Sequence, residues 1–290
     1  MINRQAMRQT LIYFFLSLPI LVMMTWFYLD KRSIKHRELK RIQLRSQPLA
    51  TEYLHILQKE FPLYLRLPIA LQYKLAGHIQ VFLDEKDIIG RNNLEINDKI
   101  RVLIAAQACL LILNRPGNYY PGFRSILVYP NTYVASSSRK EGMLHITGTS
   151  IRAGESWQRG PVILAWDHVL QGARDSRDGH NVVMHEFAHK LDEENAAMDG
   201  LPFLPTAEQY QQWSQVLNAE FNVQQKKRAD AVDDVIDSYS ATSPAEFFAV
   251  VTETFFEKPH QLEHRHPQLY AQFKQCYLLD PKQWSKSKEQ

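Results

Sequence analysis

The sequence contains only two cysteines, Cys109 and Cys276, which stand far apart and form no CxxC pattern. This excludes a disulfide framework and a zinc site built from thiolates, so we expect both side chains to be reduced and partly buried. The chain also lacks an internal repeat and any low-complexity run. Its 290 residues are 45% hydrophobic and 22% charged. Such a composition is typical of a globular protein with one large domain or two small ones.

Beyond residue 45 the chain has no excess of basic side chains. Residues 1–45 hold nine Lys and Arg against two acidic residues, whereas the remainder holds 25 basic and 29 acidic residues. The net charge of +3 therefore comes from the N-terminal segment. A nucleic-acid-binding domain usually carries a basic stripe on its folded part. The sequence thus argues against direct nucleic-acid binding.

The N-terminal segment holds one long hydrophobic run. Residues 11–29, LIYFFLSLPILVMMTWFYL, carry no charge over 19 residues, which is just long enough to span a bilayer as a helix. A cleaved secretory signal is one alternative, but Asp30-Lys31-Arg32 follows instead of a small-residue cleavage site. A buried core helix is the other, but such helices are rarely apolar all round over this length. The flank after the run is the more basic one, which places it in the cytoplasm. We therefore expect a single-pass anchor in the inner membrane, with the main domain facing the cytoplasm.

Apolar periodicity along the rest of the chain predicts an α+β fold with a small mixed sheet. Helices are expected over 95–114, near 207–228 and from Pro244. The expected strands are Ser125–Tyr129, Thr132–Ala135, Met143–Thr147 and Pro161–Trp166. We assign residues 1–30 to a membrane anchor, 31–60 to a basic juxtamembrane linker and helix, 61–282 to the main domain, and 283–290 to a disordered tail.

One short stretch of the main domain carries a metal-binding pattern. Residues 182–192 read VVMHEFAHKLD, which places His185 and His189 four residues apart with Glu186 beside the first. On a helix, residues at this spacing share one face, so both imidazoles can reach one zinc ion. Zinc lowers the pKa of a bound water, and the neighbouring carboxylate can take its proton. With 11 His and 17 Glu in the chain, about 0.02 such matches are expected by chance.

A catalytic zinc needs a third protein ligand, and the helix from Pro244 offers two carboxylates. Glu246 and Glu253 are seven residues apart and share a face. Glu246 lies among Ala, Phe and Val, where an uncompensated carboxylate is costly. However, Ser243 followed by Pro244 and Glu246 also fits a capping box, so the residues alone leave ligand and cap equally open. Glu253 is a reserve candidate for the third ligand, but we expect its side chain to lie beside a ligand or in solvent.

Three separated blocks, HEFAHKLDEENAAMDGLPF, SYSATSPAEFFAVVTETFF and GESWQRGPVILAWDHVL, resemble the Mlc titration factor A family of zinc-dependent peptidases. The downstream Tyr-x6-Glu-Phe-Phe arrangement is also similar to the catalytic domain of anthrax lethal factor. The resemblance covers roughly residues 65–280. It implies that the 61–282 domain is a zincin-like metallopeptidase with aminopeptidase-like action on short peptides.

Position by position, the resemblance implies that His185, His189 and Glu246 hold one zinc ion and that Glu186 is the general base. It also matches Tyr239 to a tyrosine that faces the metal and can hydrogen-bond the oxyanion of the substrate carbonyl. The family's name refers to sequestering a transcriptional repressor of sugar phosphotransferase genes. A repressor-binding protein in which catalysis is secondary is therefore the alternative function.

The sequence also leads to expectations for several residues outside the candidate ligand set. Asp192 fits either a hydrogen bond to a metal ligand or a solvated helix end. His260, His264 and His266 stand among Glu, Arg and Pro, so we expect them on a solvated surface. In similar zinc peptidases a strand such as Pro161–Trp166 borders the cleft and pairs with the substrate backbone.

Overall fold

The structure is a computed structural model that describes residues 22, 23, 25, 27, 28, 31–115, 119–131, 145–147, 150–152, 160–195 and 197–284. The chain divides into two units, Met1–Gln47 and Pro48–Gln290, and each is described by itself. In the first unit, residues 31–46 form a helix. The second unit begins before the expected domain start at residue 61.

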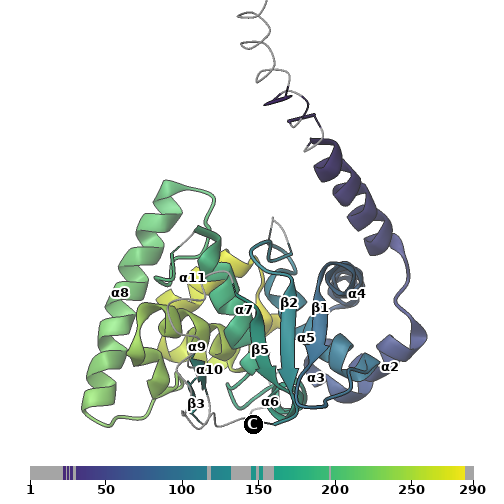
Figure 1. The fold of residues 1–290 in the computed structure, drawn as a ribbon. Helices are drawn as coiled ribbons and strands as arrows, with labels where there is room; N and C mark the ends of the chain where they lie inside the picture. Colours follow the sequence, from purple (N-terminus) through teal and green to yellow (C-terminus); the bar gives the residue numbers. More distant parts are fainter. Residues whose placement is uncertain are drawn as a thin grey trace, which may run out of the picture. The chain divides into compact units, whose positions relative to one another are not determined.

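The second unit is helix-rich and contains a small sheet (Figure 1). Its helices are α2 (Thr51–Glu60), α3 (Pro62–Arg66), α4 (Ile69–Glu85), α5 (Asp98–Leu111), α6 (Trp166–Arg174), α7 (Val182–Asp192), α8 (Ala207–Ala229), α9 (Pro244–Glu257), α10 (Pro259–Arg265) and α11 (Pro267–Tyr277), with the 3₁₀ turns η2 (Glu193–Asn195), η3 (Ser238–Thr242) and η4 (Pro281–Gln283). Its strands are β1 (Asp87–Gly90), β2 (Ser125–Tyr129), β3 (His145–Thr147), β4 (Ser150–Arg152) and β5 (Val162–Ala165).

The sheet has the order β1-β2-β5, with all three strands parallel. Ile126 and Val128 of the central strand are fully buried, as expected where helices cover a parallel sheet. β3 and β4 form a separate antiparallel pair. The expected α+β class with a small sheet is confirmed, but the described strands do not join into one mixed sheet. The expected strand Thr132–Ala135 lies outside the described residues.

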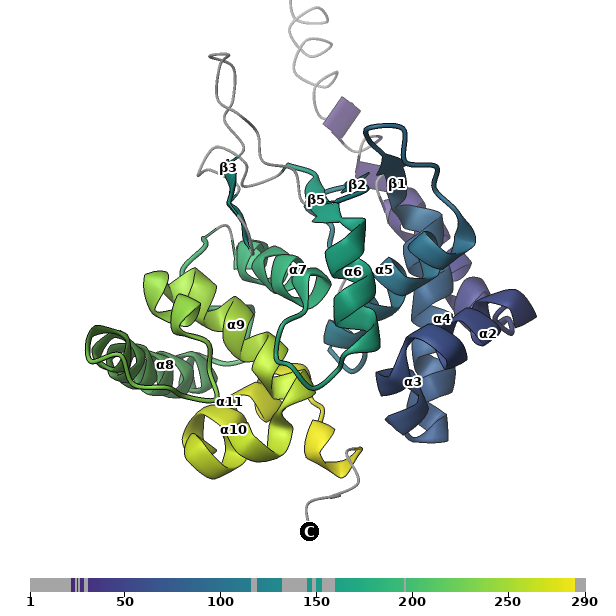
Figure 2. The same ribbon diagram turned by 90° about the horizontal axis from the view of Figure 1, so that it is seen from below.

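Helices α7 and α9 lie side by side and carry most of the candidate site (Figure 2). Each begins at a side-chain cap. The Asn181 side chain accepts a hydrogen bond from Met184 N (3.0 Å) at the start of α7. Ser243 Oγ accepts one from Glu246 N (3.2 Å) at the start of α9, with Pro244 in the first helical position. These caps fix where both helices start and therefore which side chains face the space between them.

Phe187 anchors the opposite side of α7 in an aromatic cluster. Its ring centroid lies 5.7 Å from that of Phe82 and 4.8 Å from that of Tyr120. The Tyr120 hydroxyl donates to Ala108 O (2.7 Å), which satisfies its only polar group inside the core. This packing holds α7 against α4 and α5. The packing of α7 in the core therefore fixes the position of His185 and His189 on its other side.

The loop after α7 is fastened at Gly200. This residue has a φ of +77°, a conformation that favours glycine. Its N–H donates to Asp192 Oδ2 (2.9 Å), and its carbonyl accepts from Trp213 Nε1 (2.8 Å). A Cβ at this position would lie 2.6 Å from Pro244 O. The loop thus joins the end of α7, the second turn of α8 and the first turn of α9.

Within the described part of the chain, no helix is long and apolar enough to cross a membrane. The expected membrane segment, residues 11–29, lies outside the described residues except for positions 22, 23, 25, 27 and 28. At the other end, Trp284 is buried beside η4, whereas residues 285–290 of the expected tail lie outside the described residues.

The prediction of a solvated surface is wrong for His266, which is only 4% exposed. Its Nδ1 lies 2.7 Å from Glu220 Oε2 and its Nε2 lies 2.8 Å from Asp234 Oδ2. Burial opposes the charged form, but the two carboxylates outweigh it and raise the pKa of His266 to about 9. Its partners come from distant parts of the sequence, so the local composition did not reveal them.

We expect His266 to make the folded chain less stable in alkaline solution. Its folded pKa of about 9 exceeds the reference value of 6.5, so its contribution is complete below pH 6.5 and is lost as the pH rises through 9. The full shift corresponds to about 3.4 kcal/mol, and solvent screening reduces the expected loss to roughly 2–3 kcal/mol. Urea unfolding of metal-free wild type and His266→Gln at several pH values measures it. The prediction fails if both proteins lose stability equally between pH 6.5 and 9.

Candidate metal centre

Three candidate ligand atoms converge between α7 and α9. His185 and His189 project from successive turns of α7, and Glu246 projects from the first turn of α9. His185 Nε2 lies 3.2 Å from His189 Nε2 and 3.0 Å from Glu246 Oε2. The distance from His189 Nε2 to Glu246 Oε2 is 3.6 Å. All three side chains are at least four-fifths buried.

This arrangement fits a tetrahedral metal ion. Ligand atoms about 2.0–2.1 Å from a zinc ion are separated from one another by about 3.3–3.4 Å, and the three observed distances bracket that value. Glu246 Oε2 is buried and forms no hydrogen bond of good geometry among the described residues, although two imidazole nitrogens lie near it. A buried polar atom of this kind needs a partner, which a shared cation would supply.

The sequence left open whether Glu246 is a metal ligand or part of a helix cap, and the structure shows features of both roles. Its backbone N–H is capped by Ser243 Oγ, as the capping sequence predicts. Its carboxylate, however, faces His185 and His189 instead of turning back to the Ser243 N–H. A complete capping box is found at α8, where Thr206 and Gln209 bond reciprocally. The Glu246 side chain is therefore available to a metal.

Glu253 lies on the same side of α9, two turns after Glu246, and is 6% exposed. Its Oε1 accepts a hydrogen bond from His185 Nδ1 (2.8 Å), and its Oε2 accepts one from Asn181 N. A hydrogen bond at Nδ1 leaves the Nε2 lone pair of a neutral imidazole facing the other ligand atoms. Of the two expectations for Glu253, the structure shows a position beside a ligand, not one in solvent.

The charges of the site favour a cation. Burial opposes the charged form of His185, but the neighbouring Glu246 and Glu253 carboxylates raise its pKa well above the usual value. Burial also acts to raise the pKa of Glu246, yet His185 and His189 hold it well below its usual range. Burial raises the pKa of Glu186, and both histidines partly offset this effect. Positive charge between these groups is therefore stabilised.

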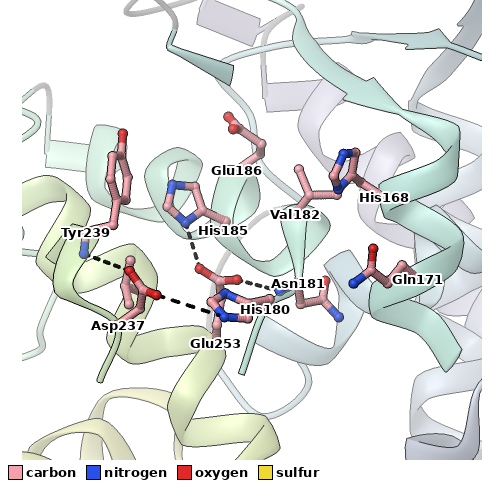
Figure 3. Close-up of a pocket in the computed structure, with 11 residues that line it drawn as sticks. His168, Gln171, His180, Asn181, Val182, His185, Glu186, Asp237, Tyr239 and Glu253 are labelled. Carbon is pink, nitrogen blue, oxygen red and sulfur yellow. Dashed lines mark hydrogen bonds and ion pairs between the residues drawn. The ribbon is translucent and has the colours of Figure 1, made fainter. Parts of the chain in front are cut away.

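A pocket of about 360 Å³ opens beside His185 (Figure 3). Glu186 and Tyr239 line it together with side chains from α6, the α7 cap and α9. The lining residues are His168, Gln171, His180, Asn181, Val182, His185, Glu186, Asp237, Tyr239, Val250 and Glu253. The pocket thus brings a carboxylate, a phenol and a candidate metal ligand to one accessible space, as a hydrolytic site requires.

Tyr239 reaches the pocket from η3. Its ring centroid lies 6.3 Å from that of His185. Asp237 caps the turn by accepting a hydrogen bond from Tyr239 N (2.7 Å), and its other oxygen lies 4.0 Å from His180 Nε2 at the exposed rim. Neither Asp237 nor His180 was predicted from the sequence, because an aspartate and a histidine in polar loops give no periodic signal.

Two other expectations can be compared with the structure. Asp192 is fully buried and accepts from Gly200 N, so it is not a solvated helix end, and within the described residues it forms no hydrogen bond to His189. Burial raises the pKa of Asp192 to about 6. Cys109 and Cys276 are free and more fully buried than expected, and Cys276 Sγ accepts a hydrogen bond from Arg115.

The sequence of this chain matches the glucose-regulated metallo-peptidase M90 family over residues 34–278. The chain belongs to that family. The M90 match spans both candidate histidines, Glu246 and every element of the pocket. A metallopeptidase family and a buried His-His-Glu group able to hold a metal therefore coincide in the same region.

Relatives of this M90 chain confirm the resemblance to Mlc titration factor A. The protein of that name from Salmonella agona is 35% identical over 231 residues, which cover 77% of this chain and 84% of the relative. The one from Salmonella arizonae is 35% identical over 233 residues, covering 77% and 89%. The uncharacterized protein slr2042 of Synechocystis is 42% identical over 241 residues, covering 82% and 88%.

Proposed function

We propose that this M90 chain is a zinc-dependent peptidase with a zincin-like catalytic domain. The observation that carries the proposal is the convergence of His185 Nε2, His189 Nε2 and Glu246 Oε2 at separations of 3.0–3.6 Å beside a pocket lined by Glu186 and Tyr239. One zinc ion, held by these three side chains, would supply a Lewis acid that polarises the scissile carbonyl and acidifies the attacking water.

The chain's own residues divide the remaining chemistry. Glu186 lies next to His185 in sequence and lines the pocket, so its carboxylate can accept a proton from the attacking water and return it to the leaving amine. Tyr239, on the η3 side of the pocket, can donate its hydroxyl hydrogen to the oxyanion that forms on the carbonyl. Asp237 keeps the η3 turn in place for that contact.

We infer aminopeptidase-like action on short peptides. The pocket's volume of about 360 Å³ accommodates a few side chains rather than a folded protein. β5 leads directly into α6, which lines the pocket with His168 and Gln171. β5 pairs with β2 on one side, and in the described part of the chain no other strand pairs with it. Its other edge is suited to pairing with an extended peptide backbone.

Binding of a transcriptional repressor is the second candidate function. The relatives named Mlc titration factor A favour it, since their name refers to titrating Mlc. The two functions use different properties of the chain, so they can coexist. A pulldown of the repressor that is unchanged by Glu186→Gln would show binding that does not depend on catalysis.

We also propose that residues 11–29 anchor the chain in the inner membrane, with the peptidase domain on the cytoplasmic side. The support is the uncharged 19-residue run and the seven basic residues among positions 31–45. Fusing a reporter that is active in only one compartment to the C-terminus tests the orientation. Recovery of the intact chain in the soluble fraction would contradict the anchor.

Metal removal tests the proposed activity. The purified full-length chain is expected to hold about one zinc ion and to cleave short peptides with a free N-terminus. Chelation should abolish cleavage, and added zinc should restore it. Peptides with an acetylated N-terminus test the aminopeptidase-like preference, since they should be cleaved poorly. A chain that is folded but neither binds zinc nor cleaves peptides would refute the peptidase proposal.

A further inference from the structure

We propose that Glu253 is a positioning residue that sets the metal affinity of the site by fixing the ring of His185, an inference that rests on the proposed zinc-dependent function. In the hydrogen bonds and ion pairs of the described residues, Glu253 is joined to neither His189 nor Glu246. Its two oxygens are instead directed to His185 Nδ1 and to the backbone N–H of Asn181 (Figure 3). Each oxygen of this buried carboxylate therefore has a separate donor.

The first contact determines the tautomer of His185. Because Glu253 accepts from Nδ1 at 2.8 Å, the proton of the neutral ring resides on Nδ1 and the lone pair on Nε2. Nε2 is the atom that lies 3.2 Å from His189 Nε2 and 3.0 Å from Glu246 Oε2. The carboxylate also makes the imidazole a stronger donor of electrons to a cation, and it limits rotation of the ring.

The second contact fixes the backbone that carries this ring. Asn181 is the N-cap of α7, and its carbonyl accepts the hydrogen bond from His185 N (2.9 Å). Since Glu253 holds Asn181 N and His185 Nδ1 together, one carboxylate links the start of the helix to the imidazole one turn later. A shift of either would be opposed by the other.

The two imidazoles differ in this support. His189 Nδ1 is buried, and among the described residues it has no hydrogen-bond partner. Of the two candidate histidine ligands, only His185 therefore has a described carboxylate, that of Glu253, bonded to its Nδ1. The position of His185, and with it the match between the three ligand atoms, depends on Glu253 more than on any group around His189.

Glu257 provides a matched control one turn further along α9. It is also buried, and it binds the same segment before α7 by accepting hydrogen bonds from Gly179 N (3.0 Å) and Asn181 Nδ2 (3.1 Å). No contact joins it to His185 in the described hydrogen bonds and ion pairs. A general loosening of the turn before α7 would therefore follow from changes at either glutamate, whereas loss of ring orientation would follow only from a change at Glu253.

The test compares zinc affinity of the full-length wild type, Glu253→Gln and Glu257→Gln by competition with a chromophoric chelator. A glutamine at position 253 has one side-chain oxygen and one NH₂ group in place of two oxygens. Either His185 Nδ1–H or Asn181 N–H therefore loses its acceptor. We expect Glu253→Gln to weaken zinc binding by roughly 10–100-fold. Glu257→Gln should stay within about threefold of wild type, although both variants melt at lower temperature in the metal-free form.

The outcomes separate the two proposals. Zinc affinity of Glu253→Gln within about threefold of wild type would overturn the positioning role, and so would an equal weakening by Glu257→Gln. In both cases the peptidase proposal would survive, because wild type would still bind zinc. A wild-type chain that binds no zinc would overturn both at once.

Discussion

Replacing Glu186 with glutamine is expected to lower kcat for peptide hydrolysis by roughly 10²–10⁴-fold, the usual range for loss of a general base. Glutamine has nearly the same shape, so it fills the same part of the pocket beside His185. It cannot accept a proton from the attacking water, and it cannot protonate the leaving amine. KM should change far less, because the substitution removes a function of the transition state and not a binding surface.

Two control measurements make this result interpretable. The zinc content of Glu186→Gln should equal that of wild type, since Glu186 is not among the three convergent ligand atoms. Its thermal unfolding should be equal or slightly improved, because a buried carboxylate is replaced by a neutral group. Hydrolysis within about tenfold of wild type would exclude Glu186 as the base.

Replacing Glu246 with alanine should have the second large effect, a loss of zinc binding. The substitution removes one of three ligand atoms and leaves an open position where Oε2 lies 3.0 Å from His185 Nε2. We expect zinc affinity to fall by more than about 100-fold, beyond the range seen when a group that only supports a ligand is removed. Peptide hydrolysis should fall with it at ordinary zinc concentrations.

Ser243→Ala separates the ligand role of Glu246 from its place in the first turn of α9. The serine hydroxyl caps the helix through Glu246 N, so its removal should cost about 0.5–2 kcal/mol of stability. Zinc binding should be retained. If Ser243→Ala and Glu246→Ala lost zinc to the same degree, the effect would belong to the helix start and not to the carboxylate.

The two helices of the site could be predicted because their signals are local. Both carry apolar runs of helical period, and Ser243 was expected to cap the second; the structure begins α9 directly after it. The cap of α7, Asn181, was not predicted but is also a local signal. β1, in contrast, was not among the expected strands. Its four residues, Asp87–Gly90, are too few for a periodic pattern, and their strand conformation depends on pairing with β2.

The roles of the buried charged residues could not be predicted for a related reason. Glu253 has the same spacing from Glu246 whether it supports a ligand or faces solvent, and its partner Asn181 lies 72 residues away. His266 is surrounded in sequence by polar residues, yet Glu220 and Asp234 reach it from 46 and 32 residues away. Such pairings are decided by how helices pack, which one sequence does not reveal.

Gly200 extends the geometric requirements of the candidate metal centre to a residue that is not among those lining the pocket. The carbonyl of Pro244 comes so close that even a methyl group at position 200 would lie 2.6 Å from it, and Glu246 follows Pro244 by two residues. Relief of that clash would displace the start of α9 and carry the third candidate ligand with it. Shifts of about 1 Å in such positions are enough to impair catalysis strongly. A methyl-sized change in this loop would therefore mimic an active-site defect.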